Sequence, residues 1–202
     1  MSKIKAVIFD AGGVLHESNT AMADDLRQEL GITSGLLKQI RSNQLSLLGS
    51  GAIDEAEFWR QVTTKYGLRE VTVAENLLGR AFAEALVEHA PISELVRELG
   101  DSNVKLAILS NTIQPHAIAL KKAGIYGGFD HVLLSHEVGM LKPDPAIYRH
   151  ALEELNVRTE ATLFIDDDPK NVEAAEALGI HGVVYTETDK IVREIRSLVF
   201  ND

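Results

Sequence analysis

Five short apolar runs along the chain have the pattern of buried β-strands. The first, Ile4–Phe9, is rich in β-branched residues and ends at Asp10, before Ala11 and two glycines. Continuous apolar runs of this length, bounded by turn residues, are typical of parallel strands that are covered on both faces of a sheet. The four later runs are Val104–Leu109, His131–Ser135, Ala161–Ile165 and Gly182–Tyr185.

Segments with the apolar spacing of amphipathic helices flank and separate the later strands. Strands that alternate with helices in this way predict an α/β fold, with a doubly wound parallel sheet covered by helices on both faces. The predicted helices are Ile92–Leu99, Ala117–Ala123, Ala146–Leu155, Asn171–Leu178 and Lys190–Val199.

The stretch from about Ser18 to about His89 has a different pattern, with helical spacing throughout and no convincing strand. Asp54 and Glu57 have the spacing of a helix-capping box, which predicts that a helix begins there. We therefore predict a core formed by residues 1–17 and 90–202, and an all-helical insert over residues 18–89. The predicted helices of the insert are Met22–Leu30, Ser34–Gln44, Glu55–Tyr66 and Val73–Val87.

Composition narrows the classes of partner and location. The chain has 202 residues, 20 basic and 30 acidic residues, a formal net charge of −10 and no cysteine. The acidic balance disfavours binding to a nucleic-acid backbone, and no run approaches the length of a membrane span. The lack of cysteine excludes disulfides and thiolate chemistry and fits a reducing compartment. We expect a cytoplasmic protein, monomeric or homodimeric, that binds neither nucleic acid nor membrane.

Polar clusters follow four of the predicted strands. They are Asp10 with Gly12 and Gly13, then Ser110-Asn111-Thr112, then Lys142-Pro143-Asp144, and finally Asp166-Asp167-Asp168. Any one of these clusters is also an ordinary helix cap or turn. Parallel strands, however, present their carboxyl ends at one edge of the sheet, so the four clusters are expected to converge around Asp10.

The chemistry of the clusters fits a phosphoryl-transfer site. Asp10 and Asp167 are hard oxygen donors suited to Mg²⁺, and Asp166 either binds the metal through water or holds a neighbour in place. Lys142 offers a positive charge to Asp10 and to a phosphoryl oxygen. The remaining phosphate oxygens are expected to meet the backbone N–H groups of the glycines and the polar groups of Ser110 and Asn111.

With these motifs the chain resembles the haloacid dehalogenase superfamily, in the subgroup with a small α-helical cap. The matching residues are Phe9-Asp10-Ala11-Gly12-Gly13-Val14, Leu109-Ser110-Asn111, Lys142-Pro143 and Ile165-Asp166-Asp167. The resemblance implies that Asp10 is a nucleophile that forms an aspartyl-phosphate, and that Ser110 and Lys142 hold the phosphoryl group. It also implies a Mg²⁺ site formed by Asp10, Asp167, the backbone carbonyl of Gly12 and, in support, Asp166. The expected substrate is a small phosphorylated metabolite.

One position departs from the family pattern and leaves three interpretations open. Phosphatases of this superfamily usually have a second aspartate two residues after the nucleophile as general acid and base, and this chain has Gly12 there. We expect a phosphatase for sugar phosphates or similar esters, whose proton transfers come from water, His16, Glu17 or a cap residue. The alternatives are a catalytically impaired phosphate-binding or regulatory protein, and a 2-haloacid dehalogenase. The paired acids Asp166 and Asp167 weigh against the dehalogenase.

Overall fold

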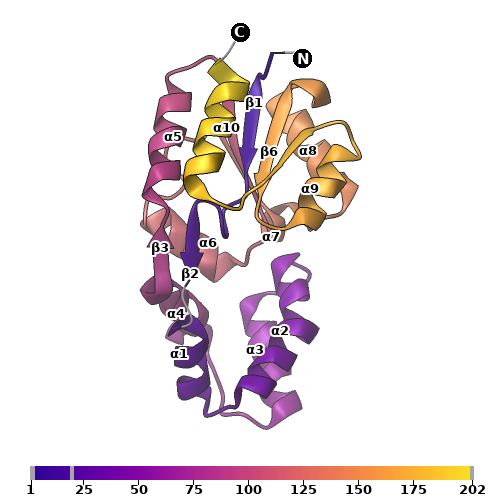
Figure 1. The fold of residues 1–202 in the computed structure, drawn as a ribbon. Coiled ribbons are helices and arrows are strands. Elements are labelled where there is room, and N and C mark those ends of the chain that lie inside the picture. Colours follow the sequence, from indigo (N-terminus) through magenta and orange to yellow (C-terminus); the bar gives the residue numbers. More distant parts are fainter. Residues whose placement is uncertain (1–2, 19–20, 201–202) are drawn as a thin grey trace.

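The centre of the protein is a five-stranded parallel sheet (Figure 1). The computed structural model describes residues 3–18 and 21–200, so the outer ends of the predicted core, at residues 1 and 202, lie outside the described residues. All four strand pairings of this sheet are parallel. In spatial order the strands are β5 (His131–Leu134), β4 (Lys105–Ser110), β1 (Ala6–Phe9), β6 (Thr162–Asp166) and β7 (His181–Val184).

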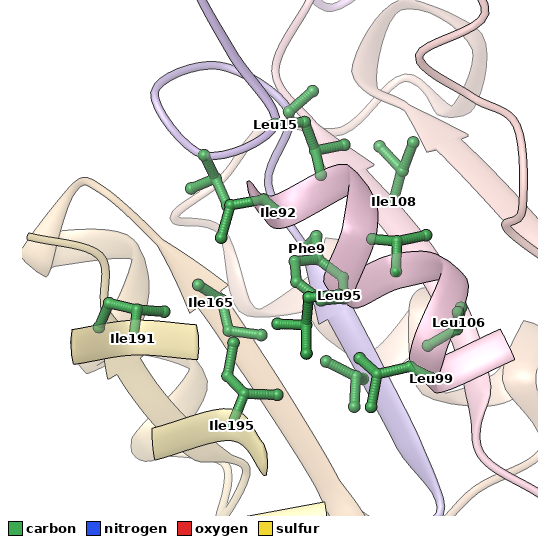
Figure 2. Packing of buried hydrophobic residues seen from close by; sticks show 14 of the residues in the cluster. Phe9, Leu15, Ile92, Leu95, Leu99, Leu106, Ile108, Ile165, Ile191 and Ile195 are labelled. Carbon is green, nitrogen blue, oxygen red and sulfur yellow. The ribbon is translucent and has the colours of Figure 1, made fainter. Parts of the chain in front are cut away.

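Helices cover both faces of this sheet, as the alternation of strands and helices predicted. On one face, α5 (Ala90–Gly100) and α10 (Thr188–Phe200) pack against side chains such as Phe9 and Ile165 (Figure 2). On the other face, α8 (Pro145–Leu155) and α9 (Pro169–Glu176) pack against a second buried cluster. The remaining elements are α6 (Gln114–Lys122), the short α7 (Ser135–Val138) and the 3-10 turn η2 (Thr159–Ala161). The prediction of a doubly wound α/β sheet is confirmed.

Among the described residues between β1 and α5, four α-helices lie beyond one end of the sheet (Figure 1). They share an apolar cluster of their own, which includes Phe58, Trp59 and Leu77. The elements are α1 (Ala21–Leu30), α2 (Ser34–Gly49), α3 (Glu55–Tyr66), the 3-10 turn η1 (Val73–Glu75) and α4 (Leu77–Ala85).

Two details of the prediction for this insert are wrong. The predicted helix Val73–Val87 is interrupted at Asn76, which has a left-handed backbone (φ 47°) between η1 and α4. Asparagine adopts this conformation more readily than most residues, so it allows the chain to change direction there.

A strand also occurs where none was predicted. β3 (Leu86–Glu88) pairs antiparallel with β2 (His16–Ser18), and the pair forms a ribbon where the chain leaves and re-enters the core. Each strand has three residues, which is too short for a clear alternating pattern. The partner of β3 is also distant in the sequence, so no local pattern indicates that residues 86–88 form a strand.

The order of the strands places the candidate site. The chain runs from β1 outward through β4 to β5, then returns to the other side of β1 for β6 and β7. The winding therefore reverses at the border between β1 and β6, and ligands of open α/β sheets bind beyond the carboxyl ends of the strands at such a point. Among the described residues, no helix is both long and apolar enough to cross a membrane.

Candidate active site

Asp10 lies directly after β1 at this switch point and is nearly buried, with 8% of its surface exposed. Its backbone N–H donates to the carbonyl of Ile165 in β6, which fixes the position of the residue at the end of the sheet. The hydrogen bonds and ion pair described for its carboxylate converge on Oδ1, from the Ala11 N–H at 2.7 Å and the Lys142 Nζ at 2.8 Å. The Oδ2 atom is therefore the oxygen available for a reaction.

Lys142 lies between two buried carboxylates. Its Nζ is 2.8 Å from Asp10 Oδ1 and 2.7 Å from Asp166 Oδ2, with only 1% of the lysine side chain exposed. Burial alone would lower the pKa of Lys142, but the negative charges of Asp10 and Asp166 raise it above its usual value. Lys142 is therefore a fixed positive charge at neutral pH.

The electrostatics of Asp10 are set by the same groups. Burial raises the pKa of Asp10 to about 6, the charge of Lys142 opposes this rise, and the charge of Asp166 adds to it. Three carboxylates near one lysine leave an excess of negative charge, which a divalent cation would neutralise.

Asp166 is the best satisfied of the three acids. Its Oδ1 accepts from the Asp168 N–H at 2.8 Å and from Asn171 Nδ2 at 3.0 Å, and its Oδ2 accepts from Lys142. The Asn171 carbonyl in turn accepts from the Tyr148 hydroxyl at 2.9 Å. With both oxygens engaged by the chain, Asp166 fits the positioning role that the sequence left open to it.

Asp167 completes an acidic group that fits a metal ion. One carboxylate oxygen from each of Asp10, Asp166 and Asp167 lies within 4.8 Å of the others, and Asp167 is exposed. Partial desolvation of the carboxyl and, secondly, the neighbouring charge of Asp166 raise the pKa of Asp167, an effect that a bound cation would reverse. Hard carboxylate oxygens in this number are the donor set that Mg²⁺ takes from proteins, so the residues present fit that ion.

The two glycines after Asp10 have different constraints. Gly13 has a left-handed backbone (φ 72°), and a Cβ there would lie 2.3 Å from Asp167 Oδ2. Gly13 is therefore required for Asp167 to approach this loop. A Cβ on Gly12 would meet nothing within 4 Å, and its backbone is not left-handed. A side chain at position 12 has room in this fold.

Ser110 and Asn111 lie at the end of β4, the neighbour of β1. Ser110 is buried at 3% exposure. The Asn111 side chain holds the backbone of Lys142, since its Nδ2 donates to the Lys142 carbonyl at 2.9 Å and its Oδ1 accepts from the Lys142 N–H at 2.8 Å. Asn111 therefore positions Lys142, in addition to the substrate contact that the sequence predicts for it.

Ser135 is a buried polar residue to which the sequence analysis assigned no role. Its Oγ accepts from the Thr112 N–H at 2.9 Å, lies 3.1 Å from the Thr112 carbonyl, and lies 2.5 Å from the Gly49 carbonyl, at the end of α2. Ser135 therefore joins the loop after β4 to the helical insert. Its partners are 23 and 86 residues away, so no local pattern reveals this function.

His16 and Glu17 were the sequence candidates for a replacement proton donor. His16 is buried at 5% exposure and lies edge-on to Phe82, with ring centroids 5.5 Å apart. Burial and, secondly, the charge of His89 lower the pKa of His16 to about 4, so at neutral pH it has no proton to give as an imidazolium. Glu17 is exposed, and its Oε2 lies 4.0 Å from His89 Nε2.

Comparison with known proteins identifies the family. Residues 4–179 match the haloacid dehalogenase-like hydrolase family. The chain belongs to this family of hydrolases.

Curated relatives include enzymes with two kinds of chemistry. The sesquiterpene phosphatase astK of Aspergillus oryzae is 29% identical over 197 residues, which cover 96% of each chain. An (S)-2-haloacid dehalogenase of a Pseudomonas species is 28% identical over 201 residues, which cover 94% of this chain and 88% of that enzyme.

A solved structure shows the same fold. A haloacid dehalogenase family enzyme from Bacteroides thetaiotaomicron, in complex with magnesium and inorganic phosphate, aligns with a TM-score of 0.77. The alignment covers 91% of this chain and 94% of that enzyme, at 24% identity.

Proposed function

We propose that the protein is a Mg²⁺-dependent phosphatase that hydrolyses small-molecule phosphate monoesters through an aspartyl-phosphate on Asp10. The observation that carries the proposal is the arrangement of Asp10, with Oδ1 held by Lys142 and the Ala11 N–H while Oδ2 is available. A carboxylate held in this way, next to a fixed cation and a metal-binding acid, is suited to nucleophilic attack on phosphorus.

The reaction has two steps. In the first, Asp10 Oδ2 forms a bond to phosphorus while the bond from phosphorus to the ester oxygen breaks, and the leaving alcohol takes a proton. In the second, water attacks the phosphorus, releases inorganic phosphate and restores the Asp10 carboxylate. The Lys142 ammonium, held in place through Asp166 and Asn171, stabilises negative charge on the phosphoryl group in both steps.

The metal ion would be held by Asp10, Asp167 and the Gly12 carbonyl. Asp166 would support this site by holding Lys142 in place. Bound Mg²⁺ supplies a Lewis acid that neutralises charge on the transferring phosphoryl group. The magnesium complex of the Bacteroides enzyme, which has the same fold, supports the choice of this ion.

The leaving alcohol must take its proton from a source other than residue 12. Because Gly12 has no side chain and His16 is neutral at pH 7, the proton is left to water, Glu17 or a residue of the helical insert. Esters with good leaving groups are therefore expected to react much faster than simple alkyl phosphates.

The proposed substrate class is a small phosphorylated metabolite. The sequence pattern favours sugar phosphates and similar esters, and the relative in Aspergillus extends the range to apolar alcohols, since it is a sesquiterpene phosphatase. A cytoplasmic location and a monomeric or homodimeric state stay predictions of the sequence.

Phosphate release tests the proposal. Purified protein should hydrolyse 4-nitrophenyl phosphate with Mg²⁺ and lose this activity when a chelator is added. The variant Asp10→Asn should be inactive with Mg²⁺ present. If wild type and Asp10→Asn are equally inert on a broad panel of phosphate esters, the protein is a binding or regulatory member of the family.

The dehalogenase relative supports a second candidate function. Displacement of halide from a 2-haloacid needs the Asp10 nucleophile and no metal. Halide release from 2-chloropropionate that is unchanged by the chelator would establish this function in place of phosphate hydrolysis.

A further inference from the structure

The helical insert contains an apolar cavity of about 90 Å³. Its wall is formed by side chains from α1, α2, α3 and α4, including Leu26, Ile40, Phe58 and Leu78. Apolar cavities of this kind stay dry and accept apolar guests.

One part of the cavity wall comes from the core of the protein. Ile113 precedes α6 and packs within the apolar cluster of the insert, and it also lines the cavity. Ile113 follows Ser110 by three residues, so their Cα atoms are separated by at most about 11 Å. One residue of the cavity wall therefore lies within one short loop of the predicted phosphate-binding residue Ser110.

Among the described residues that line the cavity, Arg41 brings the charge, because His116 is neutral at pH 7. Arg41 and His116 are the titratable residues that line the cavity among those described, and His116 belongs to the first turn of α6, next to Ile113. Arg41 lies close enough for its charge to lower the pKa of His116. The positively charged side chain is thus placed near the core, while the rest of the wall is apolar.

We propose that this cavity binds the hydrocarbon tail of the substrate, so that the enzyme prefers phosphate monoesters with an apolar linear or branched chain. The inference rests on the proposed function, because it takes the phosphate of the same ester to bind beside Asp10 and Ser110. A sugar would bring hydroxyl groups into a wall that has few partners for them, and buried hydroxyl groups without partners weaken binding. The cavity volume limits the part of the tail that it can hold to a few carbon atoms.

The test is a series of 4-alkylphenyl phosphates with ethyl, butyl, hexyl and octyl chains. These esters share one leaving-group acidity, so differences in kcat/KM report binding of the tail. We expect kcat/KM to rise by about fourfold for each added methylene at first, as for burial of a methylene group, and then to level off when the cavity is full. A flat profile from ethyl to octyl would overturn the inference.

A substitution that fills the cavity provides the second arm. Leu45 is partly buried on α2 and lines the cavity, whereas Leu36 is partly buried on the same helix and does not line it. Leu45→Phe should reduce the ratio of kcat/KM for the octyl and ethyl esters to near one, and Leu36→Phe should leave this ratio as in wild type. An equal effect of the two substitutions would contradict the inference.

Binding measurements separate this inference from the proposed function. The affinities of octylphosphonate and ethylphosphonate, which cannot be hydrolysed at the carbon–phosphorus bond, are measured by calorimetry with Mg²⁺. If no ester in the series is hydrolysed, and 4-nitrophenyl phosphate is not hydrolysed either, the proposed function fails. Tighter binding of octylphosphonate that Leu45→Phe abolishes would still support the tail site, and equal affinities would exclude it.

Discussion

The Nζ atom of Lys142 lies 2.8 Å from Oδ1 of Asp10, and 1% of the lysine side chain and 11% of the aspartate side chain are exposed. Lys142 is paired with Asp166 as well, at 2.7 Å. Removal of the lysine would leave two buried carboxylates without a compensating charge. In the absence of metal, Lys142→Met should therefore lower the free energy of unfolding at pH 7 by about 3–5 kcal/mol, as measured by urea denaturation with a chelator present.

Substitution of an exposed lysine serves as a control for the loss of a lysine side chain as such. Lys170 is exposed at the start of α9, and Lys170→Met should change the free energy of unfolding by less than about 0.5 kcal/mol. Adding Asp166→Asn to Lys142→Met should restore part of the lost stability. Equal stabilities of the two lysine variants would show that Lys142 does not balance the buried charge.

The neighbours Asp167 and Asp168 are both exposed but have different surroundings. Asp167 belongs to the acidic group with Asp10 and Asp166, while the Asp168 side chain accepts from the Lys170 N–H and caps α9. Asp167→Asn should raise the Mg²⁺ concentration for half-maximal activity by about tenfold or more, because one carboxylate ligand loses its charge. Asp168→Asn, which can still cap the helix, should leave this concentration unchanged, and similar shifts in both variants would refute the assignment.

Gly12 and Gly13 are expected to respond in opposite ways to substitution. Gly12→Asp supplies the missing carboxyl in open space, so it should raise kcat for esters with poor leaving groups, by about tenfold or more. Gly13→Ala places a methyl group against Asp167 in a left-handed backbone, and should reduce both stability and activation by Mg²⁺. An unchanged kcat for esters with poor leaving groups would mean that proton transfer does not limit turnover. A fall in kcat on poor and good leaving groups alike would mean that the backbone conformation of Gly12 is required.

His116 gives the stability of the fold a dependence on pH. Burial, and then the charges of His16 and Arg41, lower the pKa of His116 to about 4 in the folded state, against a usual value of 6.5. The unfolded chain therefore binds a proton first as the pH falls, and stability is lost between about pH 6.5 and pH 4.

His116→Phe should remove this contribution. The imidazole is stacked on Phe82 with ring centroids 4.1 Å apart, and a benzene ring can keep that contact. Relative to wild type, His116→Phe should gain up to about 2 kcal/mol in the free energy of unfolding between pH 7.5 and pH 5, as measured by urea denaturation at each pH. A stability difference between the two proteins that does not change with pH would contradict the pKa assigned to His116.

Local patterns were sufficient to predict the sheet and the meeting of its polar ends. Asp10 and Asp166 are each marked by an apolar run that precedes them, and parallel strand ends lie at one edge for any sequence that forms this sheet. The helix start at Asp54 is similarly local, and its side chain accepts from the Glu57 N–H at 2.8 Å.

The features that sequence analysis did not find depend on contacts between distant segments. Asn171 links Asp166 to Tyr148, and these residues come together only when β6 packs near α8. Ser135 hydrogen bonds to Gly49 only because the end of α2 packs near the loop after β4. β3 exists because its partner β2 lies at the other end of the insert. Spacing along the chain cannot reveal pairings that only the tertiary fold creates.

The central claim is that Asp10 is the nucleophile of a phosphatase, and trapping the intermediate tests it most directly. Wild type and Asp10→Asn are mixed with an excess of aryl phosphate and Mg²⁺, quenched in acid within the first turnovers, digested, and analysed by peptide mass spectrometry. We predict a phosphate group on Asp10 in wild type, and in Asp10→Asn neither that adduct nor phosphate release. Steady phosphate release by wild type without an adduct on Asp10, together with undiminished turnover in Asp10→Asn, would contradict it.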